Sequence, residues 1–149
     1  MFNRAEARID LARIAANLKH LKQLSGTPVM AVVKADAYGH GLVPVAKTAL
    51  EAGASALGVA LLEEAITLRE AGIAAPILAW LVPPGSDFKL AVDNQIELAA
   101  SSIKALEEIG AVKSEFRPKV HLEVDTGMSR GGFLGEWGKL DAHHVANID

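Results

Sequence analysis

Short apolar runs recur along this chain at intervals close to the length of a repeated strand and helix unit. Successive runs start 27, 21, 20 and 22 residues apart, near Val29, Ala56, Ile77, Glu97 and Lys119. Short apolar runs rich in β-branched residues are typical of buried parallel strands, which are covered on both faces. The pattern therefore predicts five strands of a parallel sheet.

Segments with the apolar spacing of helices lie between these runs. Most of them are followed by a glycine, and they cover residues 42–52, 61–71, 87–92 and 101–109. A further helix is expected before the first strand, because Asp10 is a candidate N-cap and an apolar stripe runs from Leu11 to Leu24. The sequence Ser25-Gly26-Thr27-Pro28 is expected to end that helix.

Alternating strands and helices of this length predict an α/β fold whose parallel strands are joined by right-handed crossovers. Spacing alone leaves two architectures open, a barrel and an open doubly wound sheet. A doubly wound nucleotide-binding sheet normally carries a glycine fingerprint after its first strand. Neither that fingerprint nor a phosphate-binding P-loop occurs in this chain.

Composition narrows the classes of function. The chain has 149 residues, of which 50% are hydrophobic and 22% charged, as in a globular domain with a core. Its 15 Lys and Arg are scattered and balanced by 18 Asp and Glu, which argues against a nucleic-acid partner. The absence of cysteine excludes disulfides and thiolate metal sites, and no other metal-binding motif is present, so no metal is expected. Residues 1–6 lack a signal-peptide core and no apolar run approaches the roughly 20 residues of a membrane helix, so a cytoplasmic protein without a membrane partner is expected.

The first apolar run ends on a lysine that is followed at once by a glycine-containing loop. The stretch from Lys34 to Gly41 reads Lys-Ala-Asp-Ala-Tyr-Gly-His-Gly. A partly desolvated lysine at a strand end favours its neutral amine, the form that attacks a carbonyl to make a Schiff base. Its position alone is also consistent with a lysine whose amine simply reaches solvent. Tyr38 can fold back across the loop, while Gly39 and Gly41 permit a tight turn.

The string from Val32 to Gly41 resembles the pyridoxal phosphate attachment motif of alanine racemases. In that family the lysine at the position of Lys34 carries the cofactor, and the tyrosine at the position of Tyr38 hydrogen-bonds its phosphate. The resemblance implies a fold-type III pyridoxal-phosphate enzyme with a (β/α)8 TIM barrel. It further implies a homodimer whose substrate is an amino acid. The enzyme would interconvert L-alanine and D-alanine and so supply D-alanine for peptidoglycan.

A second stretch, from Asp125 to Arg130 after the fifth apolar run, resembles the family motif Asp-Thr-Gly-Met-x-Arg. The resemblance places Arg130 beside the phenolic oxygen of the cofactor and the carboxylate of the substrate, where a planar cation is useful. Lys34 and Arg130 both follow strands, so a barrel is expected to bring them to its carboxyl-end face.

Three further residues are candidates for supporting roles. Many racemases carry a carbamylated lysine seven residues before the arginine, and this chain has Glu123 there. Strand alternation places Glu123 and Asp125 on one face, so either carboxylate could orient Arg130, and carbamylation would be unnecessary. Trp80 lies late in the third apolar run, which extends from Ile77 to Leu81, where it could line the cofactor ring or serve as ordinary barrel packing.

The length of the chain limits the barrel that it can form. A (β/α)8 barrel takes about 250 residues, so 149 residues leave room for about five strand and helix units. Residues 1–149 are therefore expected to be the N-terminal part of a racemase-like barrel domain, without the C-terminal β domain. In the family that domain of a partner subunit provides a tyrosine as the second base, whereas Tyr38 is the only tyrosine here. We expect the chain alone to be inactive. The alternatives are a stand-alone module that binds pyridoxal phosphate and a racemase of serine or another small amino acid.

Overall fold

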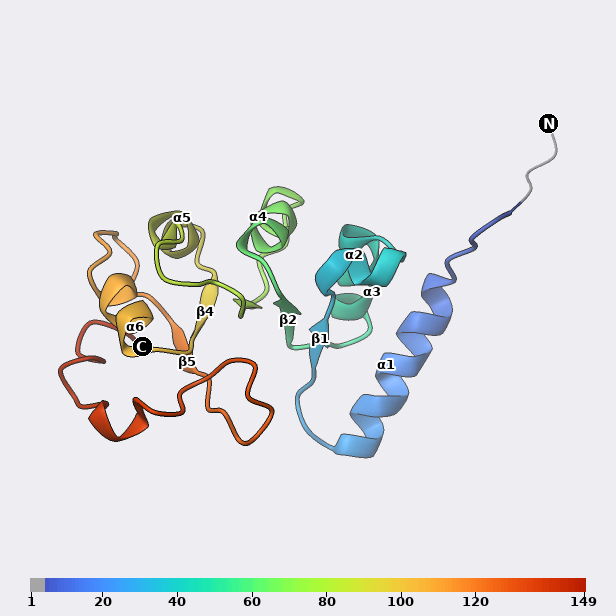
Figure 1. The fold of residues 1–149 in the computed structure, drawn as a ribbon. Helices are drawn as coiled ribbons and strands as arrows, with labels where there is room; N and C mark the ends of the chain where they lie inside the picture. Colours follow the sequence, from blue (N-terminus) through green and yellow to red (C-terminus); the bar gives the residue numbers. More distant parts are fainter. Residues whose placement is uncertain (1–4) are drawn as a thin grey trace.

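A computed structural model describes residues 5–149. The expectation about a signal peptide rests partly on residues 1–4, which lie outside the described residues. Five parallel strands form one sheet in the order β1-β2-β3-β4-β5 (Figure 1). Their bounds are β1 Met30–Val32, β2 Ala56–Val59, β3 Ile77–Ala79, β4 Glu97–Ala100 and β5 Val120–Leu122. The five parallel strands predicted from the apolar runs are confirmed.

The strand order distinguishes between the two architectures that the spacing left open. Each strand pairs with the one before it in the sequence, as in a barrel, whereas a doubly wound sheet reverses its order at one point. The protein is therefore an α/β fold in which five strand and helix units form part of a barrel.

Five helices begin and end close to the predicted positions, whereas the stretch after the first strand, which was predicted to be a glycine-containing loop, forms a short helix, α2. The helices are α1 Leu11–Ser25, α2 Lys34–Gly39, α3 Leu42–Glu51, α4 Leu62–Glu70, α5 Phe88–Asp93 and α6 Ile103–Gly110, with a short 3-10 helix at Trp137–Lys139. At the start of α1 the Asp10 carboxylate accepts a hydrogen bond from the Arg13 N–H at 3.1 Å. Its C-cap is Gly26, with φ of 65°, a conformation that glycine adopts without strain. In the described residues 5–149 no helix is both long and apolar enough to cross a membrane.

The two faces of the sheet differ in burial. Leu57, Ile77 and Leu98 have no exposed surface and form the core between the sheet and the helices. On the other face, Val32 pairs in register with Gly58, and its side chain is 54% exposed. An exposed inner face is what a part of a barrel presents, because a closed barrel fills its interior with side chains from all its strands.

The last residue of the chain lies against β5. The Val120 N–H donates to the Asp149 carbonyl at 2.7 Å, and the Asp149 N–H donates to the Pro118 carbonyl at 2.8 Å. An ion pair of 2.9 Å joins Arg117 to the Asp149 carboxylate. Asp149 thus occupies the pairing position of a further parallel strand beside β5.

Candidate functional site

The turn that follows β1 has an unusual backbone. Ala35, Asp36, Ala37 and Tyr38 have φ between 49° and 55°, so α2 is a turn of left-handed helix made from residues other than glycine. This conformation costs roughly 1–2 kcal/mol per residue, because Cβ approaches the following carbonyl oxygen. Strained backbone of this kind persists only where surrounding contacts hold it, and it clusters at functional sites.

Local hydrogen bonds hold part of this turn. The Ala37 N–H donates to the Val33 carbonyl at 2.9 Å, and the Gly41 N–H donates to the Asp36 carbonyl at 3.0 Å. One oxygen of the Asp36 carboxylate accepts from the Leu42 N–H at 2.6 Å, at the first turn of α3. Gly41 has φ of 94°, so the tight turn predicted for this glycine is confirmed.

Lys34 and Tyr38 lie together on the turn. The Lys34 Nζ is 5.1 Å from the centroid of the Tyr38 ring, within the range of a cation–π contact. Lys34 is half-buried, whereas Tyr38 is 72% exposed and contributes little to the core. The tyrosine thus folds back toward the lysine, and both side chains stand at the carboxyl end of β1.

Glu64 holds the same turn from a distant part of the chain and is not among the residues predicted from the sequence. One of its carboxylate oxygens accepts from the Ala35 N–H at 2.5 Å, and the other accepts from the N–H groups of Ala60 and Leu61 at 3.0 and 3.1 Å. A glutamate at the third position of a helix is a known capping signal. Nothing local in the sequence signals its bond to Ala35, which spans 29 residues.

Trp80 follows β3, and its ring lies on the inner face of the sheet over Gly58 of β2. A Cβ atom added to Gly58 would come within 2.7 Å of the Trp80 ring and 3.1 Å of the Met30 sulfur. Gly58 thus makes room for the indole, which is half-buried beside β1 and β2. This position is compatible both with packing and with lining a ligand at the carboxyl ends of the strands.

A closed loop after β5 carries Arg130. The Phe133 N–H donates to the Glu123 carbonyl at 2.7 Å, and the Asp125 N–H donates to the Phe133 carbonyl at 3.2 Å. Phe133 is 2% exposed and anchors the loop in the core. Gly132 has φ of 100°, and a Cβ there would lie 2.6 Å from the Asp125 nitrogen. The second glycine after Arg130 is thus required by close backbone approach.

Asp125 organises this loop from within. One oxygen of its carboxylate accepts from the N–H groups of Gly127 and Ser129 at 2.8 and 3.0 Å. These backbone hydrogen bonds, from Ser129 first and Gly127 next, hold the pKa of Asp125 below its usual value. The carboxylate is thereby engaged by the backbone of its own loop.

The predicted site residues are brought together only in part. In the part of the chain from residue 5 onward, no ion pair joins Arg130 to Glu123 or Asp125. A Glu123 carboxylate oxygen does lie 3.1 Å from where a Cβ of Gly131 would stand, directly beside Arg130 in the sequence. Lys34 and Arg130 follow β1 and β5, the two edge strands of the five-stranded sheet, so their convergence on one site stays a prediction.

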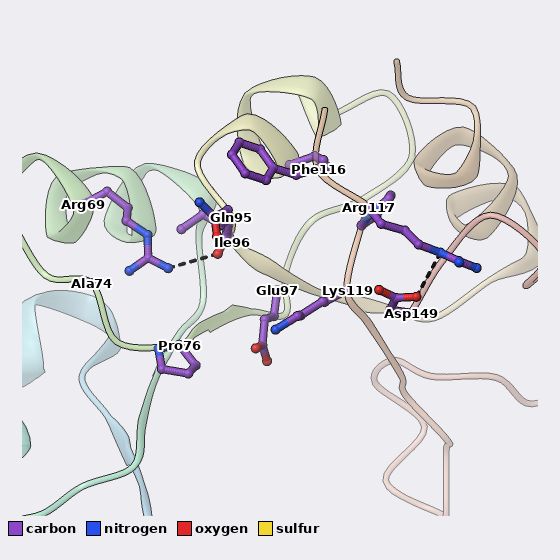
Figure 2. Close-up of a pocket in the computed structure, with 12 residues that line it drawn as sticks. Arg69, Ala74, Pro76, Gln95, Ile96, Glu97, Phe116, Arg117, Lys119 and Asp149 are labelled. Atoms are coloured by element: carbon purple, nitrogen blue, oxygen red, sulfur yellow. Dashed lines mark hydrogen bonds and ion pairs between the residues drawn. The ribbon is translucent and has the colours of Figure 1, made fainter. Parts of the chain in front are cut away.

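A separate cavity of about 310 Å³ lies at the opposite, amino ends of β3 to β5 (Figure 2). Arg69 enters it and donates to four backbone carbonyls at 2.7 to 2.9 Å, those of Ile73, Ala75, Asn94 and Gln95. Burial lowers the pKa of the Arg69 guanidinium, and the nearby Glu97 raises it by less. Because its guanidinium is used by backbone carbonyls, Arg69 is a structural residue of the strand ends.

Comparison with known proteins points to one family. Residues 9–144 match the family model described as alanine racemase, N-terminal domain. An alanine racemase from Mycolicibacterium smegmatis is 54% identical over 131 residues, which cover 86% of this chain and 34% of that protein. The chain spans about a third of the length of such curated relatives.

Solved structures agree with these sequence matches. The alanine racemase from D-cycloserine-producing Streptomyces lavendulae superposes with a TM-score of 0.89 and 40% identity, over 93% of this chain and 37% of that one. A histidine racemase from Leuconostoc mesenteroides subsp. sake gives a TM-score of 0.77 and 35% identity, over 83% of this chain and 34% of that one.

Proposed function

The chain belongs to the alanine racemase family, and on that premise we propose that it holds pyridoxal phosphate at the carboxyl end of β1 for the interconversion of L-alanine and D-alanine. One observation carries the proposal. A strained left-handed turn presents the Lys34 amine beside the Tyr38 ring, at the end of a barrel strand where such folds place their chemistry. Because the chain spans about a third of its relatives, the activity proposed is that of a longer enzyme.

The residues at this end of the sheet fit the cofactor. An aldehyde requires a primary amine, which Lys34 provides. A phosphate requires donors, and the exposed Tyr38 hydroxyl is one. The cofactor's own phenolic oxygen is an anion, which a guanidinium such as that of Arg130 can hold. The Trp80 indole offers an apolar surface for the cofactor ring.

Pyridoxal phosphate, when bound, draws electron density from the α-carbon of an amino acid and so acidifies its α-proton. The chain's contribution is to accept and return that proton. We assign this role on one face of the substrate to the Lys34 Nζ. Racemisation also requires a proton donor on the opposite face. Tyr38 is the only tyrosine in the chain and stands on the same turn as Lys34, so it is on the wrong side for that role.

We therefore assign the second base to a partner subunit. The family resemblance supplies a candidate, a tyrosine from a C-terminal β domain that lies outside residues 1–149. This assignment makes the active enzyme a homodimer, and a cytoplasmic source of D-alanine for peptidoglycan follows from the family role. The proposed arrangement leaves the chain described here with one base of the two.

Glu123 is proposed to orient Arg130 toward the substrate carboxylate. Its carboxylate lies beside Gly131, whereas the Asp125 carboxylate is held by N–H groups of its own loop. Glu123 provides directly the negative charge that a carbamylated lysine would provide in other members of the family.

Another amino acid is the second candidate for the substrate. The similarity to a protein named histidine racemase favours this alternative, because one scaffold then serves two side chains of different size. A stand-alone module that binds pyridoxal phosphate without racemising any amino acid is the remaining alternative.

Exchange of the α-proton in D2O tests the proposal. The chain is incubated with pyridoxal phosphate and either L-alanine or D-alanine, and loss of the α-proton is followed by NMR. Because the chain supplies one base, we expect the α-proton of one enantiomer to exchange faster with the wild type than with Lys34→Ala. We expect neither protein to form the opposite enantiomer. Equal exchange by the wild type and Lys34→Ala, or interconversion by the Lys34→Ala variant, contradicts the proposal.

A further inference from the structure

We propose that Glu64 is a positioning residue, which locks the strained turn after β1 and so fixes the direction in which the Lys34 side chain leaves the sheet. Its consequence for the cofactor rests on the proposed function, whereas its consequence for the turn does not. The proposal is carried by hydrogen bonds between segments that are far apart in the sequence.

The carboxylate of Glu64 joins two loops at the carboxyl end of the sheet. It accepts from Ala35, the first left-handed residue of α2, and also from Ala60 and Leu61, which precede α4. Glu64 is the third residue of α4, a position where a carboxylate can accept from the N–H groups at the start of the helix. The bond to Ala35 thus ties the turn to a rigid element.

The peptide unit that is held is the one that follows Lys34. The N–H of Ala35 belongs to the bond between these two residues, so fixing its direction fixes the ψ angle of Lys34. The Lys34 Nζ reaches its place above the Tyr38 ring from this fixed backbone. Without the bond, the left-handed residues lose one of the contacts that offset their strain.

Three N–H donors converge on two oxygens, and this geometry requires a carboxylate. Glutamine offers one acceptor oxygen, and its amide NH2 group would face a donor on the other side. Aspartate keeps the charge but is one methylene shorter, so it cannot reach both loops. Glu63 is the natural control, because it is exposed and next to Glu64 on the same helix.

A role confined to capping α4 makes a different prediction from the positioning role. Loss of a cap lowers stability and exposes the N–H groups at the start of the helix. Loss of a positioning contact also releases the Ala35 amide and slows the reaction at Lys34, while the amides in the middle of α4 stay protected.

The experiment compares the wild type with Glu64→Gln, Glu64→Asp and Glu63→Gln. Amide hydrogen exchange is measured at Ala35 and Leu68, and the rate of Lys34 modification by pyridoxal phosphate is measured by borohydride reduction and peptide mass mapping. Loss of a charge-assisted bond is expected to speed Ala35 exchange and slow Lys34 modification by about tenfold in both Glu64 variants. Glu63→Gln is expected to behave as the wild type.

Protection of the Leu68 amide reports that the Glu64→Asp variant is folded. The proposal is overturned if the Ala35 amide of folded Glu64→Asp exchanges at the same rate as that of Glu63→Gln. If Glu64→Gln does not fold, the Glu64→Asp comparison decides. If the wild type is not modified at Lys34 but the Ala35 amide responds, the proposed cofactor function fails and the positioning of the turn stands. If Lys34 is modified equally fast in the wild type and in both Glu64 variants, the positioning role toward the cofactor fails.

Discussion

Replacing Arg69 with methionine removes the guanidinium from the amino ends of the strands while keeping most of the aliphatic stem. The side chain donates to four backbone carbonyls. Those of Ile73, Ala75 and Asn94 are in partly buried bonds, and that of Gln95, shown in Figure 2, is in an exposed one. A bond from a charged donor contributes about 1.5–3 kcal/mol, and access of water to the freed carbonyls reduces the loss.

At about 1 kcal/mol for each partly buried bond, and little for the exposed one, Arg69→Met is expected to lower the free energy of unfolding by about 3 kcal/mol. For a chain of this length the melting temperature then falls by roughly 6–12 °C. Urea unfolding followed by circular dichroism measures the change, with an unchanged slope against denaturant showing that the unfolded state is the same.

Arg8→Met is the matched control, because the Arg8 side chain is 83% exposed and its ion pair among residues 5–149 is with Glu6, two residues before it. Its effect on the free energy of unfolding is expected to stay below about 0.5 kcal/mol. A loss of less than about 1 kcal/mol in Arg69→Met, or one equal to that of the control, would show that the strand ends do not depend on this guanidinium.

Three further predictions concern the carboxyl end of the sheet. Because the pKa of Asp125 is held below its usual value by backbone hydrogen bonds, its stabilisation of the loop is complete above the unfolded pKa of about 3.9 and is lost as the pH falls through the folded pKa. Amide exchange in residues 125–132 is therefore expected to accelerate below about pH 4, and an equal acceleration in Asp125→Asn would count against this. Ala37→Val places a β-branched side chain at φ of 49°. In urea unfolding this variant is expected to be less stable than both the wild type and Ala37→Gly by at least about 1 kcal/mol. A valine variant as stable as the wild type would contradict the left-handed turn. In an alanine racemase that carries this N-terminal domain, Glu123→Gln is expected to lower the racemisation rate about tenfold. Bicarbonate depletion is expected to leave the wild-type rate unchanged. A Glu123→Gln variant with the wild-type rate would show that Glu123 does not act in the site.

Local signals explain how much of the fold could be predicted. The second and third strands begin at Ala56 and Ile77, as predicted, because a buried parallel strand appears in the sequence as a short continuous apolar run. The first helix begins after Asp10 as predicted, because a cap is a contact between residues three apart. Strand order was not predictable from spacing, since it depends on which strands pair across the sheet.

The candidate site depended more on contacts between distant residues. Ala35, Ala37 and Tyr38 have no intrinsic preference for the left-handed region, so the turn could not be foreseen from their identities. It is held partly by Glu64, whose bond to Ala35 spans 29 residues. The motif identified Lys34 correctly as a lysine at a strand end, but the backbone that presents it is a property of the folded structure.

Covalent trapping shows whether Lys34 is the residue that binds pyridoxal phosphate. The chain is mixed with a limiting amount of pyridoxal phosphate, reduced with borohydride, digested and mapped by mass spectrometry, with the exposed Lys47 as the internal comparison. We expect the adduct to form on Lys34 well before it forms on Lys47, and Lys34→Arg to abolish this early adduct. An adduct that forms on Lys34 and Lys47 at the same rate, or an early adduct that persists in Lys34→Arg, would contradict this expectation.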